Sequence, residues 1–249
     1  MDMNTFNDWI RDFEAERERR GADGDPDWAP GARLPAAVWR SVQRFQVGED
    51  GDGANLIGKA DEAADTAYAA AARLFVAEEQ NHARLLGLLL DAGGVPLLGS
   101  HWSDVVFVRL RRLFGLRIEL LVLLIAEVIA LRYYRALRDG TTDPLVTEVA
   151  ARILADEERH VPFHCARLRQ ESLGVLPLAG WRMLLCAVTV FVALDHGPAL
   201  RRLGVRRTAF VADVLRTPAG AAWSTAGRGG FTRRPAARRR RSAPYTEAK

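Results

Sequence analysis

Cysteine is scarce in this chain. Among its 249 residues only Cys165 and Cys186 are cysteines, and no Cys-x-x-Cys pair occurs. Two isolated thiols exclude a disulfide framework, a zinc ribbon and a rubredoxin-type iron site. The first 20 residues are charged throughout and lack the apolar run of a secretory signal. Both features fit a reducing compartment, so we expect a cytoplasmic location.

Strand-forming segments are also missing. No run alternates β-branched and polar residues, and Ala, Leu and Arg dominate between clusters of Gly and Pro. The hydrophobic share of 49% and the charged share of 27% are typical of a soluble globular protein. The sequence therefore predicts an all-α fold.

No apolar stretch reaches the roughly 20 uninterrupted residues that a membrane-spanning helix needs. The stretch from Leu116 to Ala130 is broken by Arg and Glu, and the stretch from Met183 to Leu194 is short. We interpret both stretches as buried helices. Peripheral contact of the second with a membrane surface stays open as an alternative.

The net charge of +4 comes from the C-terminal end and not from the body of the chain. An arginine-rich run with few apolar residues is typical of a disordered, solubilising tail. Contact of this tail with nucleic acid or anionic lipid is the less favoured interpretation. The arginines concerned are Arg228, Arg233, Arg234 and Arg238 to Arg241.

Four long helices are predicted in the middle of the chain. The first begins at Pro35 and is interrupted by the glycine-rich run at 48–53, which does not match a calcium loop. The connection 92–100 is long enough for a crossover. The other three predicted helices are Asp65–Asp91, Asp104–Arg138 and Pro144–Gly174.

Shorter helices are predicted on either side of these four. Phe6, Trp9 and Phe13 recur at helical spacing behind the possible caps Thr5 and Asp8. Further helices are expected at Leu178–Leu194 and Ala209–Leu215, packed on the main body. The predicted organisation is an N-terminal helix and loop at 1–33, a four-helix unit at 34–174, additional helices at 175–217 and the tail at 218–249.

Two of the five histidines follow a glutamate by three residues, in AEEQNH (Glu79, His82) and DEERH (Glu157, His160). On a helix this spacing places the carboxylate and the imidazole on one face. A single pair of this kind is common on solvated helix surfaces and would carry little weight.

The spacing between glutamates makes the pattern more specific. Each pair lies 30 residues after another glutamate, because 79 minus 49 and 157 minus 127 both equal 30. The two halves repeat at a constant offset, since 127 minus 49, 157 minus 79 and 160 minus 82 all equal 78. Glu127 stands within LLVLLIAEVIAL, where an ionised side chain is costly unless it is paired or bound to a cation.

These glutamates and histidines can share one level of an antiparallel helix arrangement. The midpoints between the paired glutamates fall at Ala64 and Thr142, where turns are predicted, and residues equidistant from a turn lie at the same height. Two divalent cations would neutralise four carboxylates, and mixed oxygen and nitrogen ligands suit iron or manganese. The predicted metal ligands are Glu49, Glu79, His82, Glu127, Glu157 and His160.

The order Glu, Glu-x-x-His, Glu, Glu-x-x-His over four helices resembles the ferritin-like di-iron carboxylate superfamily. The resemblance covers about residues 35–172, and the ligand spacing is most similar to single-domain members such as aldehyde-deformylating oxygenase. It implies a ferritin-like four-helix bundle holding two iron ions, with manganese or a mixed pair left open. By resemblance, Glu79 and Glu157 bridge the metals, and Glu49 and Glu127 are the single carboxylates. His82 and His160 are terminal ligands by the same resemblance, and catalysis would depend on all six residues.

The resemblance further implies an O2-activating oxidase or oxygenase acting on an apolar small molecule. Phe75, Leu120, Leu123 and Leu124 could wall the site, although core packing explains them equally well. Electrons would come from an external donor, because the chain has no cysteine-based electron-transfer site. Alternatives left open are a ferroxidase or iron store, a dimanganese catalase-like enzyme, a metal-free scaffold, and an oligomer.

Four neighbouring residues have secondary interpretations. Asp156 and Glu78 could hydrogen-bond His82 and His160 respectively across the bundle, or could be ordinary surface carboxylates. Tyr134 is interpreted as a core tyrosine, with lining of the cavity or electron relay as the alternative. His164, one turn past His160 and beside Pro162, is interpreted as structural.

Overall fold

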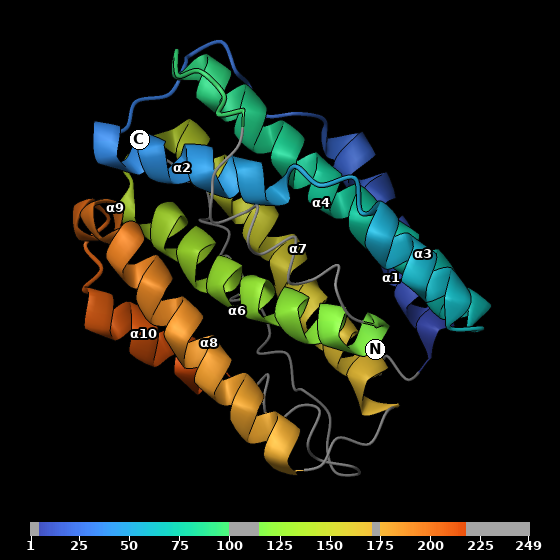
Figure 1. The fold of residues 1–249 in the computed structure, drawn as a ribbon. Coiled ribbons are helices and arrows are strands. Elements are labelled where there is room, and N and C mark those ends of the chain that lie inside the picture. The colour runs from blue at the N-terminus through green and yellow to red at the C-terminus, as the bar shows by residue number, and fades with distance from the viewer. Residues whose placement is uncertain (1–4, 100–114, 171–174, 218–249) are drawn as a thin grey trace, which may run out of the picture.

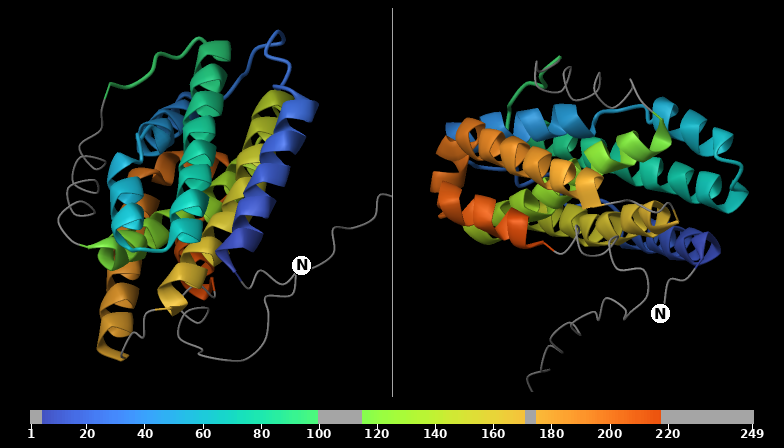
Figure 2. Two further views of the ribbon diagram at one scale, coloured as in Figure 1. Left: turned by 90° about the vertical axis from the view of Figure 1, so that its right-hand side faces the viewer. Right: turned by 60° about the horizontal axis from the view of Figure 1, so that its bottom comes forward.

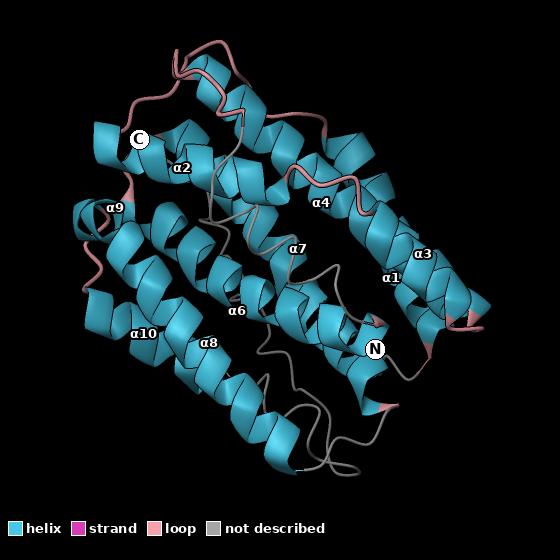
Figure 3. Ribbon diagram, in the orientation of Figure 1, coloured by secondary structure: helices cyan, strands magenta, loops and turns pink. Residues whose placement is uncertain are grey.

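All regular structure in the described part of the chain is helical. The computed structural model describes residues 5–99, 115–170 and 175–217, and these ranges contain helices and no strand (Figure 1, Figure 3). The predicted all-α class is confirmed. The predicted tail at 218–249 and the predicted helix start at Asp104 lie outside the described residues.

The four helices that carry the candidate ligands correspond to the four predicted ones. Two of them, α6 and α7, are joined by a connection of only three residues and pack along their length (Figure 1). Buried apolar residues recur along α6 at helical spacing, among them Leu120, Leu124 and Val128. The bounds are α2 Ala36–Glu49, α4 Thr66–Ala92, α6 Leu116–Gly140 and α7 Pro144–Arg169.

The predicted interruption of the first helix is present. Helix α2 ends at Glu49, and a separate helix α3 (Ala54–Glu62) begins after four residues. Gly53, which precedes α3, has φ +63°, and a Cβ at this position would collide with the side chain of Val76 on α4. The break therefore needs glycine for its backbone conformation and for the close approach of α4.

Both predicted turns are found where the chain reverses. Asp65 caps α4 by accepting a hydrogen bond of 2.9 Å from the Tyr68 N–H, and the preceding Ala64 takes φ 56°. Asp143 caps α7 in the same way, with Pro144 as the first helical residue. These caps fix how far each candidate glutamate lies from its turn.

Helix α1 (Phe6–Asp23) docks on the outer side of α4 and α7, as predicted (Figure 2). Thr5 and Asp8 form the expected capping box at its start. Phe6 and Trp9 are buried and pack edge-on against Phe163 of α7, with ring centroids 6.2 and 5.5 Å apart. This aromatic contact holds α1 against the main body.

Three further helices lie beside α6 and α2 (Figure 1). The Trp181 indole N–H donates a hydrogen bond of 2.8 Å to the Leu121 carbonyl of α6. Asp213 pairs with Arg132 of α6 at 2.8 Å. The two predicted C-terminal helices, α8 and α10, therefore pack on the main body, whereas α9 was not predicted. The bounds are α8 Val175–Asp195, α9 Gly197–Arg202 and α10 Arg207–Arg216.

The prediction that Met183 to Leu194 is a buried helix is wrong for most of its surface. From Trp181 onward, only every fourth residue of α8, such as Trp181 and Leu185, is buried, whereas Met183 is 74% and Leu194 57% exposed. The stretch is apolar on both faces, so its composition could not reveal that the core covers one face only. By length and composition, its window Leu178–Asp195, with mean hydropathy 1.7, is sufficient for a membrane span. Contact of α8 with a membrane surface stays the alternative interpretation of this stretch.

Substitution of Gly53 by alanine is expected to destabilise the protein by roughly 2–4 kcal/mol, because the left-handed conformation and the overlap with Val76 both oppose a Cβ. Urea denaturation followed by circular dichroism measures the loss. Gly51→Ala is the matched control, since a Cβ there meets nothing within 4 Å and φ is not positive. Equal stability of the two variants would contradict the role given to Gly53.

Candidate metal centre

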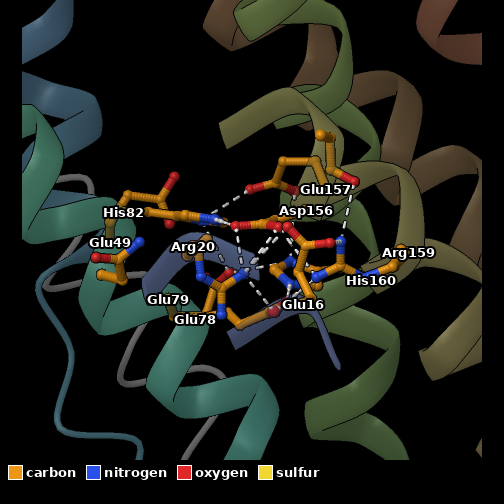
Figure 4. A network of polar contacts seen from close by, with 12 residues as sticks. Glu16, Arg20, Glu49, Glu78, Glu79, His82, Asp156, Glu157, Arg159 and His160 are labelled. Carbon is orange, nitrogen blue, oxygen red and sulfur yellow. Dashed lines mark hydrogen bonds and ion pairs between the residues drawn. The ribbon is translucent and has the colours of Figure 1, made fainter. Parts of the chain in front are cut away.

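The structure brings the six predicted ligands together in the interior. Glu49 is the last residue of α2, and Glu127 lies in the middle of α6. Helices α4 and α7 each contribute one Glu-x-x-His pair (Figure 4). His82 and His160 are fully buried, and the side chain of Glu79 is 20% exposed. Within each half, the two glutamates are equally far along the chain from the turn at Ala64 or Thr142, which is why the sequence predicted that the six side chains meet.

Two of the carboxylates lie between the two imidazoles. Glu79 Oε1 is 3.4 Å from His82 Nδ1 and 3.1 Å from His160 Nδ1. Glu157 approaches the same two nitrogens at 3.5 and 3.8 Å, one with each oxygen. Glu79 and Glu157 are therefore each close to both imidazoles.

The other two carboxylates interact with different histidines of this group. Glu127 Oε2 is 3.4 Å from His160 Nδ1. Glu49 interacts electrostatically with Glu79 and His82 and accepts a hydrogen bond of 2.5 Å from the Tyr134 hydroxyl. Each half of the centre thus combines one histidine, one single carboxylate and a share of the two central carboxylates.

The inward-facing atoms of the centre lack hydrogen-bond partners. His82 Nδ1, His160 Nδ1, Glu79 Oε1 and Glu157 Oε2 are all buried and make no hydrogen bond, only the carboxylate–imidazole contacts described above. One ligand atom from each of these four residues can be chosen so that all lie within 4.8 Å of one another. Unpaired buried polar atoms cost about 1–3 kcal/mol each, and metal coordination would satisfy them together. The donor set fits a pair of divalent cations.

The outer nitrogens of both imidazoles are held by carboxylates from the opposite helix. His82 Nε2 lies 3.1 Å from Asp156 Oδ2, and His160 Nε2 lies 3.1 Å from Glu78 Oε2. The predicted cross-bundle hydrogen bonds are therefore present. Donation from Nε2–H leaves the Nδ1 lone pair directed into the centre, as a metal ligand requires.

Two arginines that sequence reasoning missed hold these outer carboxylates in place. Arg20 of α1 lies 2.7 Å from Glu78 and 3.1 Å from Asp156 (Figure 4). Arg159 of α7 contacts the same two side chains at 2.6 and 3.0 Å. The sequence could have indicated Arg159, because it stands between the candidate ligands Glu157 and His160. Nothing in the sequence connects Arg20 with the site, because that contact depends on where α1 docks.

The charges of the centre perturb one another strongly. Burial, together with the nearby Glu79 carboxylate, raises the pKa of Glu49 well above its usual value. Burial and the neighbouring Glu127 do the same to the pKa of Glu157. Burial lowers the pKa of His82 and His160, but hydrogen bonds to carboxylates outweigh it and raise both pKa values. All four raised pKa values favour the protonated forms of these side chains when no metal is bound.

The four apolar residues proposed as walls of the site are buried, and one of them contacts a candidate ligand. The ring of Phe75 packs edge-to-face against the His160 ring, with centroids 4.7 Å apart. Leu120, Leu123 and Leu124 are in the core on α6. A surface hollow of about 920 Å³ lies beside the break after α2, between Gln46 and Pro96, and none of the six ligands lines it.

Comparison with known proteins gives no match. No protein-family model, curated protein or solved structure matches this chain.

The metal-free protein is expected to lose stability as the pH rises from 6 to 9. The folded pKa values of His82, His160, Glu49 and Glu157 are raised, so their stabilising protons are bound at low pH and lost as the pH rises through those values. Metal-loaded protein should show the opposite trend, because ligands must deprotonate to bind. Urea titrations of chelated and loaded protein measure both trends.

A substitution at Glu157 separates this effect from general alkaline destabilisation. In Glu157→Gln one raised pKa is removed, so the metal-free protein should lose stability less steeply with pH. Glu158→Gln, at the next and exposed position, should leave the trend as in wild type. Metal-free stability that increases between pH 6 and 9 would contradict the proton retention inferred for the centre.

Proposed function

We propose that this protein is a di-iron carboxylate protein that uses O2 to oxidise an apolar small molecule. The observation that carries the proposal is the set of buried, inward-facing Glu and His atoms that lie close together without a hydrogen bond. Ordinary buried polar residues find hydrogen bonds, and these do not. Manganese or a mixed pair would satisfy the same donor set.

The distances support one assignment of ligands to two ions. Glu79 and Glu157 would bridge, because each lies near both imidazoles. His82 and Glu49 would complete one position, and His160 and Glu127 the other. The charge of four carboxylates then balances that of two divalent cations. The cations would relieve the repulsion between the carboxylates, which protons relieve when no metal is bound.

The arrangement of helices α2, α4, α6 and α7 supports a ferritin-like four-helix bundle as the architecture. One single glutamate and one Glu-x-x-His pair come from each half of the chain, at a constant offset of 78 residues. Such inward-projecting sets characterise di-iron bundles. Helices α1, α8, α9 and α10 would then be additions around the bundle.

Several residues support an oxidase or oxygenase more than simple metal storage. Phe75 and Leu124 are buried and would exclude water from the side of His160 and Glu127. Bound ferrous ions would supply the redox chemistry that reduces O2. Tyr134 orients Glu49 through its 2.5 Å hydrogen bond, and burial raises the pKa of its phenol, so it keeps its proton at neutral pH. Electrons would come from a separate donor.

The decisive measurement is the metal content of protein purified without chelators. We expect about two iron or manganese atoms per chain, by analogy with the two positions that the ligand set provides. The variant Glu79→Ala/Glu157→Ala should lose both, because each removed carboxylate serves both positions. Elemental analysis after anaerobic loading gives the stoichiometry.

A matched double variant controls for the loss of two glutamates. Glu62→Ala/Glu158→Ala removes exposed carboxylates and should keep the full metal content. O2 uptake by the ferrous protein that depends on an apolar substrate would support the oxygenase, and uptake without substrate a ferroxidase. Rapid peroxide turnover with manganese would support a catalase-like enzyme. Folded wild-type protein that binds neither metal would refute the proposal.

A further inference from the structure

His164 is a fully buried histidine with no hydrogen bond on either ring nitrogen. It lies on α7, one turn after His160. A neutral imidazole has one N–H to donate and one lone pair to offer, and leaving both unused in the interior is costly. An apolar residue would fill the same space without that cost. The presence of histidine therefore points to a partner that is not an amino acid.

The ring of His164 is directed at the candidate metal centre. Its Nε2 lies 3.5 Å from Glu127 Oε1, while the other oxygen of that carboxylate lies 3.4 Å from His160 Nδ1. Two donors that bind one ion at about 2.1 Å and at roughly 90–110° to each other are about 3.0–3.5 Å apart. The separation is long for a hydrogen bond and suits two ligands of the same ion.

The same environment holds His160 and His164 side by side. Phe75 of α4 packs edge-to-face against both rings, with centroids 4.7 Å away in each case and the same interplanar angle of 77°. The two imidazoles therefore line one wall next to Glu127. Each of His82, His160 and His164 has a buried ring nitrogen that lies near a carboxylate and makes no hydrogen bond.

The internal repeat shows that this histidine is present in only one half. The offset of 78 residues that relates His82 to His160 relates Leu86 to His164. Leu86 is fully buried, so the equivalent position in the first half is apolar. The single carboxylate of the first half, Glu49, instead accepts a hydrogen bond from Tyr134 of α6.

We propose that His164 Nε2 is a seventh ligand, bound to the ion that His160 and Glu127 hold. The inference rests on the proposed function and makes the two metal positions unequal. One position offers the imidazoles of His160 and His164. The other offers the imidazole of His82 and the carboxylate of Glu49, which Tyr134 holds by a hydrogen bond. Additional nitrogen favours later first-row divalent metals, so cobalt should fill the His160 position first.

Cobalt(II) binding to the full-length chain tests the assignment. The chelated protein is titrated anaerobically with Co²⁺, and visible absorption follows each step. Wild type should bind two ions with resolved affinities. His164→Leu copies the residue of the first half and should weaken the tighter step by a factor on the order of 10–100, change its spectrum and leave the other step in place.

The control is His196→Gln, a histidine outside the centre that contacts Ser41 at 2.7 Å, and it should titrate as wild type does. Unchanged affinities and spectrum in His164→Leu would overturn the inference alone. Equal weakening of both steps would also overturn it, because that result indicates loss of packing and not loss of one ligand. A wild-type chain that binds no cobalt, iron or manganese would overturn the proposed function and this inference together.

A measurement on wild type avoids any dependence on a variant. In Co²⁺-loaded protein, each coordinated imidazole contributes a hyperfine-shifted N–H proton resonance that exchanges with solvent. Three such resonances are expected from His82, His160 and His164. Two resonances in a protein that binds two cobalt ions would exclude His164 as a ligand.

Discussion

The central constraint on this structure is the burial of four carboxylates among apolar helices. Glu49, Glu127 and Glu157 are at most 9% exposed, and Glu79 joins them between two imidazoles. Carboxylates this close cannot all be ionised in a dry interior without compensating positive charge. The raised pKa values of Glu49, Glu157 and both histidines favour protons as this compensation in the metal-free protein. Divalent cations would compensate without protons.

Much of the surrounding structure serves to hold this charged group in position. Asp156 and Glu78 fix the two imidazoles from the opposite helix, and Arg20 and Arg159 balance the charge of those carboxylates. Arg20 comes from α1, so the docking of an apparently peripheral helix completes the network. The result is a layered arrangement in which ligands, their orienting carboxylates and the balancing arginines depend on one another.

The approximate two-fold repeat of the chain is broken at specific positions. The pair Glu49 and Glu127 repeats, but Glu49 ends a helix whereas Glu127 lies within one. Gly53 permits the break after Glu49 and the close approach of α4. A carboxylate at a helix end has fewer restraints from its own helix, and the hydrogen bond from Tyr134 supplies one. Although Glu49 and Glu127 occupy equivalent positions of the sequence repeat, the helices hold the two carboxylates in different ways.

The amino-acid sequence by itself was sufficient for the all-α class, the four helices that carry the candidate ligands, the turns at Ala64 and Thr142, and the six residues that meet in the interior, but not for α9. These follow from periodicity, capping and equal spacing, which are local or nearly local properties. The contact of Arg20 with the centre, the direction of His164 and the exposed face of α8 were decided by the tertiary structure. Helical periodicity defines which residues share a face, but only packing decides which other helix, or solvent, meets that face.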